Sequence, residues 1–230
     1  METTKKYELT SETIKFNDIT LHRIKALKDF SYVKAGDLGG WIEKEDNLSQ
    51  SGDAWVFGNA KVYDNAIVSD NAIIYGNAKV YGRAKVYDNA EICGYAEIFE
   101  NAEVYGNARI YDNAVVCDNA KVYDDAMCSD NAEVFGSSVV CDYAYVLGNA
   151  QVYDNAVVCD NAKVYDDAKV FGNARVHGNT QVYGSAKVFG NAEVCNHAKV
   201  YVNAQVYGNA VVCSDIKIFG NSRVCGDSYL

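Results

Sequence analysis

Residues 60–83 read AKVYDN AIVSDN AIIYGN AKVYGR, which is four copies of a six-residue unit. In each copy an Ala is followed two positions later by Val or Ile, and the copy ends on Gly or Asp and then Asn or Arg. Because residues two apart in an extended chain point to the same side, the Ala and the aliphatic residue would face a common interior. Gly, Asp and Asn favour the tight backbone of a corner. Each unit therefore predicts a short β-strand followed by a corner.

The same unit extends far beyond this stretch. Its small residue recurs every six positions from Ala54 to Ser228, and its aliphatic position recurs from Val56 to Leu230, without an insertion or deletion. Strands joined only by corners leave no room for crossover helices, so such a chain must coil into a solenoid. The 230 residues contain no proline, which agrees because each strand inside a ladder needs its backbone N–H. We therefore expect an all-β fold.

The pattern Val-x-Gly/Asp-Asn-Ala-x resembles the hexapeptide repeat of left-handed parallel β-helices. In that family three units make one triangular coil, so the resemblance implies a solenoid of about ten coils. Residues 18 apart would then stack in one column, about 4.8 Å from each other. The left hand follows from the resemblance alone, since general crossover rules favour right-handed connections.

Residues 1–47 do not repeat, and we assign them to a small N-terminal β cap in front of a solenoid at residues 48–230. The stretch 12–22 predicts two strands around an Asn-Asp turn. Trp41 is expected to close the first coil, because the end strands of a solenoid are sticky edges. The repeat runs to Leu230 without an obvious cap, so one expectation is end-to-end pairing of two copies through the last coil.

A second resemblance comes from residues 22–27, HRIKAL, and residues 34–49, KAGDLGGWIEKEDNLS. Together with the repeats they resemble YdcK-like proteins, which are bacterial and phage-borne or prophage-borne hexapeptide-repeat proteins. Members are often labelled acyltransferases on the strength of the repeat. Enzymes of that class are typically trimers that bind acyl-CoA between neighbouring solenoids and use a catalytic His. The resemblance thus implies acetyl-CoA or another acyl-CoA as cofactor, with His177 or His197 as the base.

The uninterrupted repeat favours a different function. Acyltransferases of this class often throw a loop out of the coils, whereas this repeat expels none, so nothing obvious builds a closed substrate pocket. Our leading interpretation is a non-catalytic scaffold or binding protein without a cofactor. It would self-associate, as a trimer or an end-to-end dimer, or display a face to a partner or ligand. A trimeric acyl-CoA-dependent acyltransferase is the alternative.

The residue after each aliphatic position should point outward, and it is usually Tyr, Phe or Cys. One column of such residues runs from Phe57 to Phe219, and another runs from Tyr63 to Cys225. Rings stacked on each other would cover the strands and stabilise them. The alternative is a binding face for a protein, a sugar or a nucleobase.

The third column differs, because four Cys flank one His on successive coils: Cys141, Cys159, His177, Cys195 and Cys213. Beside the cysteines lie uncharged residues where other repeats often carry Lys or Glu, namely Val139, Val157 and Val211. The preferred interpretation is an apolar interface stripe made of the four Cys and the three Val residues. Acyl or thiol chemistry at His177, Cys195 and His197 is one alternative, and a soft-metal site is another.

We predict no metal site, because a straight column does not easily supply four tetrahedral ligands and no CxxC spacing exists. The recurring cysteines suit a reducing compartment, so we expect them to be reduced, although Cys141 and Cys159 could pair in vitro. Three carboxylates stack at one corner, at Asp124, Asp142 and Asp160. They could collect Ca²⁺, but we expect a solvated acidic corner.

Charge and hydropathy exclude several partners. The net charge is −10, and residues 87–167 hold 16 Asp or Glu against three Lys or Arg. This does not suit nucleic-acid binding, although an acidic rod could mimic the charge of DNA. No apolar run reaches the length of a membrane helix, and the first residues, METTKKYELT, lack the apolar stretch of a secretory signal. We therefore expect a cytoplasmic protein that contacts no membrane.

Overall fold

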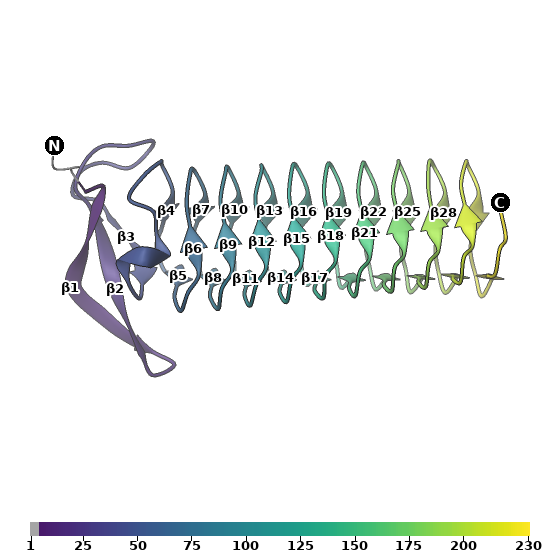
Figure 1. The fold of residues 1–230 in the computed structure, drawn as a ribbon, viewed down its shortest axis with the longest axis horizontal. Helices are drawn as coiled ribbons and strands as arrows, with labels where there is room; N and C mark the ends of the chain where they lie inside the picture. The colour runs from purple at the N-terminus through teal and green to yellow at the C-terminus, as the bar shows by residue number, and fades with distance from the viewer. Residues whose placement is uncertain (1–4) are drawn as a thin grey trace.

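The structure, a computed structural model, describes residues 5–230 and is a parallel β-solenoid of about ten turns (Figure 1). Apart from a single 3₁₀ turn, η1 (Glu45–Asn47), the regular elements among these residues are strands. The strands form three sheets, in which each solenoid strand pairs with strands 18 residues away, as Glu97 does with Val115. The all-β solenoid and its 18-residue period are thus confirmed, and its hand stays a prediction.

The first sheet has 13 strands and includes the non-repeating N-terminal segment. Its strands are β1 (Tyr7–Phe16), β2 (Ile19–Ala26), β3 (Leu38–Ile42), β5 (Lys61–Val62), β8 (Lys79–Val80), β11 (Glu97–Ile98), β14 (Val115–Val116), β17 (Glu133–Val134), β20 (Gln151–Val152), β23 (Lys169–Val170), β26 (Lys187–Val188), β29 (Gln205–Val206) and β32 (Arg223–Val224).

The second sheet has 10 strands. They are β4 (Trp55–Val56), β7 (Ile73–Ile74), β10 (Glu91–Ile92), β13 (Arg109–Ile110), β16 (Met127–Cys128), β19 (Tyr145–Val146), β22 (Lys163–Val164), β25 (Gln181–Val182), β28 (Lys199–Val200) and β31 (Lys217–Ile218).

The third sheet has nine strands. They are β6 (Ile67–Val68), β9 (Lys85–Val86), β12 (Glu103–Val104), β15 (Lys121–Val122), β18 (Val139–Val140), β21 (Val157–Val158), β24 (Arg175–Val176), β27 (Glu193–Val194) and β30 (Val211–Val212).

The core is built from the two inward positions of the unit. Side chains such as Ala96 and Ile98 are fully buried, and this pattern continues through the coils. Four of the small positions carry hydroxyl residues instead of Ala, and two of these, Ser138 and Thr180, are buried. Each hydroxyl donates a hydrogen bond to the backbone carbonyl three residues earlier, at 2.8 Å for Ser138 and 2.6 Å for Thr180, so neither polar group is left unsatisfied.

The corners use left-handed backbone, which explains their restricted residue types. Asp118 has φ 58° and Gly136, one coil later, has φ 72°. The Asp118 Oδ2 accepts the Gly136 backbone N–H at 2.8 Å, so the acidic residue also ties neighbouring coils together. Val202 is an exception, since a β-branched residue with φ 65° is strained.

The N-terminal strands extend the first sheet. β1 and β2 form an antiparallel hairpin whose turn residues, Asn17 and Asp18, have φ values of 46° and 66°, so the predicted Asn-Asp turn is confirmed. β3 pairs with β2 on one side and runs parallel to β5 on the other. The division at residues 47 and 48 stays a prediction, and β3 already lies in register with the coils.

Trp41 does not close the first coil, contrary to the expectation from the sequence. Its ring lies in a separate outer cluster with Leu21 and Tyr63, and the Arg23 guanidinium lies 5.0 Å from the ring centroid. The buried side chains that the N-terminal segment contributes to the main core include Ile24 instead. In the described part of the chain, the structure contains no helix long and apolar enough to cross a membrane.

Candidate functional site

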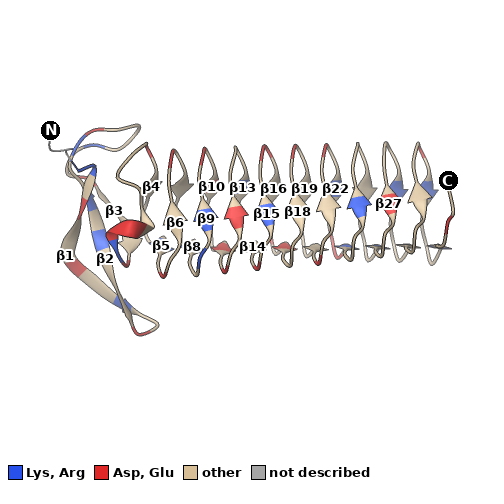
Figure 2. Ribbon diagram, in the orientation of Figure 1, with Lys and Arg blue, Asp and Glu red and all other residues tan. Residues whose placement is uncertain are grey.

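The predicted interface stripe lies on the outer face of the third sheet. Val139 pairs with Val157 across β18 and β21, and Glu193 pairs with Val211 across β27 and β30, so these residues project from successive coils. The neighbouring strands β9, β12 and β15 carry charges, whereas β18 and β21 carry none (Figure 2). The structure therefore places the stripe on one face, and its role as an interface stays a prediction.

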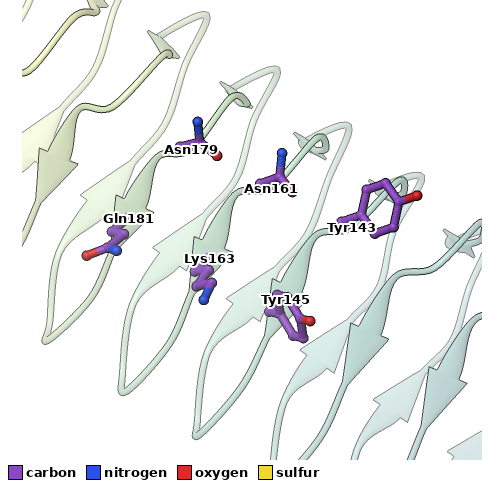
Figure 3. A pocket seen from close by; sticks show the side chains of 6 residues that line it. All are labelled: Tyr143, Tyr145, Asn161, Lys163, Asn179 and Gln181. Carbon is purple, nitrogen blue, oxygen red and sulfur yellow. The ribbon is translucent and has the colours of Figure 1, made fainter.

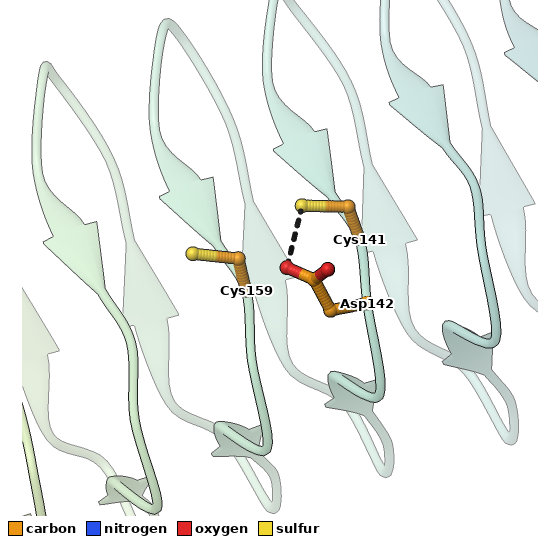
Figure 4. A group of neighbouring side chains, drawn as sticks. All are labelled: Cys141, Asp142 and Cys159. Carbon is orange, nitrogen blue, oxygen red and sulfur yellow. Dashed lines mark hydrogen bonds between the residues drawn. The ribbon is translucent and has the colours of Figure 1, made fainter.

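Cys141 and Cys159 form the first chemically distinct group in this column (Figure 4). The Cys141 thiol is 7% exposed and donates a hydrogen bond to Asp142 Oδ2 at 3.5 Å. A hydrogen bond between the two thiols raises the pKa of Cys141, which burial raises further, and lowers the pKa of Cys159.

His177 is held between two carboxylates from neighbouring coils. Its Nε2 lies 2.9 Å from Glu193 Oε1, and its Nδ1 lies 3.8 Å from Asp160 Oδ2. The His177 side chain is 28% exposed. A potential ligand atom from each of His177, Glu193 and Cys195 lies within 4.8 Å of the other two.

Cys195 and Cys213 are joined by a disulfide between adjacent coils, with a Cα–Cα distance of 4.6 Å. The expectation that all cysteines are reduced is wrong for this pair. The physical reason is the solenoid itself, because identical positions on stacked coils fall within the distance range that a disulfide requires.

Cys128, which replaces an inward aliphatic residue, is fully buried.

His197 does not join the cluster at Cys195, although the sequence grouped the two residues. It is exposed at a corner that precedes β28, and its Nε2 lies 3.2 Å from Asn179 Nδ2. Sequence reasoning missed Glu193, and it placed Asp160 at an acidic corner without pairing it with His177. Glu193 follows His177 by 16 residues, and the same separation joins Tyr81 to Glu97 at 3.1 Å, so a spacing of one coil minus two residues brings two side chains within reach of each other.

A groove on the second sheet was also missed (Figure 3). It has a volume of about 430 Å³ and is lined by Tyr143, Tyr145, Asn161, Lys163, Asn179 and Gln181. The lining side chains come from three successive coils of one sheet and the corner before it, so the groove lies along the surface rather than inside a cleft between elements. The Lys163 Nζ lies 5.2 Å from the Tyr145 ring centroid and partly covers its face.

The aromatic columns are stacked ladders. Tyr105 and Tyr123, for example, have ring centroids 4.8 Å apart and planes within 5° of parallel, and Tyr153 and Phe171 are similar at 4.9 Å and 1°. Each ring within a ladder therefore covers the face of the next one. This geometry supports self-stacking as their role, because a nucleobase or sugar that stacks on an aromatic ring needs an open face.

Comparison with known proteins agrees with this architecture. The family model described as YdcK Beta solenoid repeat matches residues 60–76 and 102–118. The chain is also 36% identical over 61 residues to a protein of Escherichia coli (strain K12) named "Uncharacterized acetyltransferase YdcK". That match covers 23% of this chain and 19% of the relative. The resemblance to YdcK-like repeat proteins is thus confirmed, and the match spans about a fifth of the relative's length.

Proposed function

We propose that this protein is a non-catalytic β-solenoid scaffold that assembles with copies of itself through the interface stripe on the third sheet. The observation that carries the proposal is the loss of charge at β18 and β21. Their outward residues are Val139 and Val157, whereas β15, the strand before them, presents Lys121, which pairs with Glu103 at 3.0 Å. A partner can bury a flat, uncharged patch between charged strands without removing charged groups from water.

The regularity of the coils supports a scaffold. Between residues 54 and 230 each coil follows the last without an inserted loop. The groove on the second sheet is bounded by side chains of that sheet and its corner. Small-molecule sites usually enclose most of their ligand, whereas straight sheets offer extended flat contacts.

A side-by-side trimer fits the direction of the stripe. The stripe runs along the solenoid from Val139 to Val211, interrupted at β24 and β27 by Arg175 and Glu193, so three parallel copies could turn it toward a common axis. Closed cyclic symmetry of this kind uses every copy equally and stops growth. The Val and Cys side chains would then lose the water that now contacts them, which stabilises the assembly by about 25 cal/mol for each Å² of apolar area.

The test is the mass of the protein in solution and its response to one charge. Sedimentation equilibrium should give a trimer for the wild type and a monomer for Val157→Lys at the same protein concentration. Val115→Lys is the matched control, because Val115 occupies the same outward, half-buried position on the first sheet. A wild type that stays monomeric, or an equal effect of both substitutions, would refute the proposal. A dimer unaffected by Val157→Lys would favour end-to-end pairing.

An acetyltransferase is the second candidate, and one contact favours it. The 2.9 Å approach of His177 Nε2 to Glu193 provides the carboxylate-paired imidazole that a general base needs, and the Escherichia coli relative is named as an acetyltransferase. Calorimetric titration with acetyl-CoA tests it. The enzyme requires binding that weakens in His177→Ala or His197→Ala and survives in His22→Ala, whose imidazole lies on β2. The scaffold requires that the titration with acetyl-CoA releases no heat of binding.

A further inference from the structure

We propose that His177, Glu193, Cys195 and Cys213 form a Zn²⁺ site when the Cys195–Cys213 disulfide is reduced. Disulfide and metal would then be two alternative states of one side-chain cluster. The cluster lies at β24, β27 and β30, so Cys195 and Cys213 belong also to the C-terminal part of the interface stripe, whereas the assembly proposed above is tested at the uncharged strands β18 and β21.

Three of the ligands already converge. His177 Nε2 lies 2.9 Å from Glu193 Oε1, and one ligand atom from each of His177, Glu193 and Cys195 lies within 4.8 Å of the others. Zn²⁺ binds N, O and S atoms at about 2.0–2.3 Å, which sets its tetrahedral ligands roughly 3.3–3.8 Å apart. Small side-chain rotations are therefore sufficient to bring these three atoms to bonding distance of one ion.

Cys213 supplies the fourth ligand from the next coil. Its Cα lies 4.6 Å from that of Cys195, and in the disulfide the two sulfurs are bonded. Reduction separates them only as far as side-chain rotation carries them, which leaves two thiolates side by side for one metal. Because side chains can lean along the solenoid axis, a straight column supplies four ligands once a residue from the adjacent row, Glu193, joins it.

The surroundings of His177 select the ligand nitrogen. The Asp160 carboxylate lies 3.8 Å from Nδ1, on the side away from Glu193. When Zn²⁺ binds, the ring proton that Nε2 donates to Glu193 would move to Nδ1, where the Asp160 carboxylate lies, and the Nε2 lone pair would face the metal, as at zinc sites with second-sphere carboxylates. Cys195 is 5% exposed, so its sulfur is shielded from water, whereas Cys213 is half-buried.

The mixture of donors selects zinc. One imidazole, two thiolates and one carboxylate suit a borderline-soft ion, whereas Mg²⁺ and Ca²⁺ prefer oxygen alone. The other cluster in this column, at Cys141, Asp142 and Cys159, has two sulfurs and a carboxylate but no imidazole. It is therefore the natural internal control.

A phosphine reductant supplies the two electrons that reduce the Cys195–Cys213 disulfide. A trialkylphosphine and one water convert the disulfide into two thiols, and the phosphine becomes its oxide. Zn²⁺ then displaces one proton from each thiol when it binds. Metal uptake should consequently release protons and should block reoxidation of Cys195 and Cys213.

Calorimetric titration with zinc sulfate tests the site. Protein reduced with a phosphine should bind one Zn²⁺ per chain, and the oxidised protein should bind at least a hundredfold more weakly. Glu193→Gln, which keeps the shape of the side chain, and His177→Ala should each weaken binding at least tenfold. Asp160→Asn should weaken it less. The double variant Cys141→Ser/Cys159→Ser should bind like the wild type.

Cobalt gives a second readout that does not depend on heat. Co²⁺ added to the reduced protein should produce the visible absorption of a tetrahedral site and thiolate charge-transfer bands, and Cys195→Ser should reduce these bands. Circular dichroism of each variant checks that the solenoid is intact. Either of two results would overturn the proposal: reduced wild type that takes up no Zn²⁺, or binding that survives His177→Ala and is lost in the Cys141/Cys159 double variant.

Discussion

Lys6 offers a sharp test of the packing between the N-terminal segment and the first coil. Its side chain is fully buried, and its Nζ donates hydrogen bonds to the carbonyl oxygens of Ala54 at 2.9 Å, Gly52 at 3.3 Å and Ser51 at 3.4 Å. Burial lowers the pKa of the Lys6 ammonium from 10.5 to about 8. The folded protein therefore holds this proton less tightly than the unfolded chain does.

The sign and size of the effect follow from linkage. Between pH 8 and 10.5 unfolded Lys6 is protonated and folded Lys6 is not, so deprotonation adds stability to the fold as the pH rises. Each pH unit in this interval contributes about 1.4 kcal/mol. Below pH 8 the contribution is constant, because both states bind the proton. From pH 8 to 9.5 the wild type should therefore gain about 2 kcal/mol relative to Lys6→Met, which cannot titrate.

Urea unfolding of both proteins at several pH values measures this difference. The titration of the thiols and phenols contributes equally to both proteins, so it cancels from the difference between them. Lys5→Met is the control, because the Lys5 side chain is 54% exposed and pairs with Glu45 at the surface. A stability difference between wild type and Lys6→Met that stays constant from pH 8 to 9.5 would show that Lys6 keeps an ordinary pKa and that its burial is wrongly described.

Three further substitutions test the fold. Gly39→Ala should lower the free energy of unfolding, measured with urea, by about 1–3 kcal/mol, because the added Cβ would lie 2.6 Å from the Val56 carbonyl oxygen. Leu38→Ala is the control, because this side chain is 51% exposed and its loss should cost less than about 1 kcal/mol. Ile98→Ala empties a fully buried position and should cost about 2–5 kcal/mol, measured by the same unfolding curves. The pKa of Glu103 is lowered, chiefly by its hydrogen bond with Lys121. Its stabilising effect is therefore present above the ordinary Glu pKa and is lost as the pH falls through the lowered value. Glu103→Gln should reduce this loss of stability in acid, and an unchanged dependence of stability on acid pH would contradict the ion pair.

Most of the fold could be predicted because the repeat encodes its own neighbours. Once the period of 18 is known, the partner of any residue in the next coil follows by addition, and the sheets, core and outward columns follow with it. Trp41 shows the limit of this reasoning. It precedes the repeat, so no periodicity says whether its ring lies over the core or on the outside beside Tyr63.

The candidate site was only partly predictable, for a related reason. Column membership follows from the period, so Cys195, Cys213 and His177 were placed on one face correctly. Contacts between adjacent rows depend on side-chain rotamers, and those brought Glu193 to His177 while leaving His197 with Asn179. The disulfide depends on a separation of stacked Cα atoms that is close enough for bonding, which the repeat implies but does not by itself select.

A repeated fold also changes where functional information lies. Nearly every coil buries Ala together with Val or Ile and turns similar corners, so these positions account for the stability of the fold. Residues that serve a function must therefore occupy the outward positions. At many of these positions Tyr and Phe stack on the ring of the next coil, and Lys and Glu form ion pairs between coils. The interface stripe departs from that pattern: Val replaces Lys or Glu at β18, β21 and β30, and Cys or His replaces Tyr on the coils from Cys141 to Cys213. Because replacing a stacked ring or an ion pair forfeits local stabilisation, these departures have a cost that assembly or metal binding would offset.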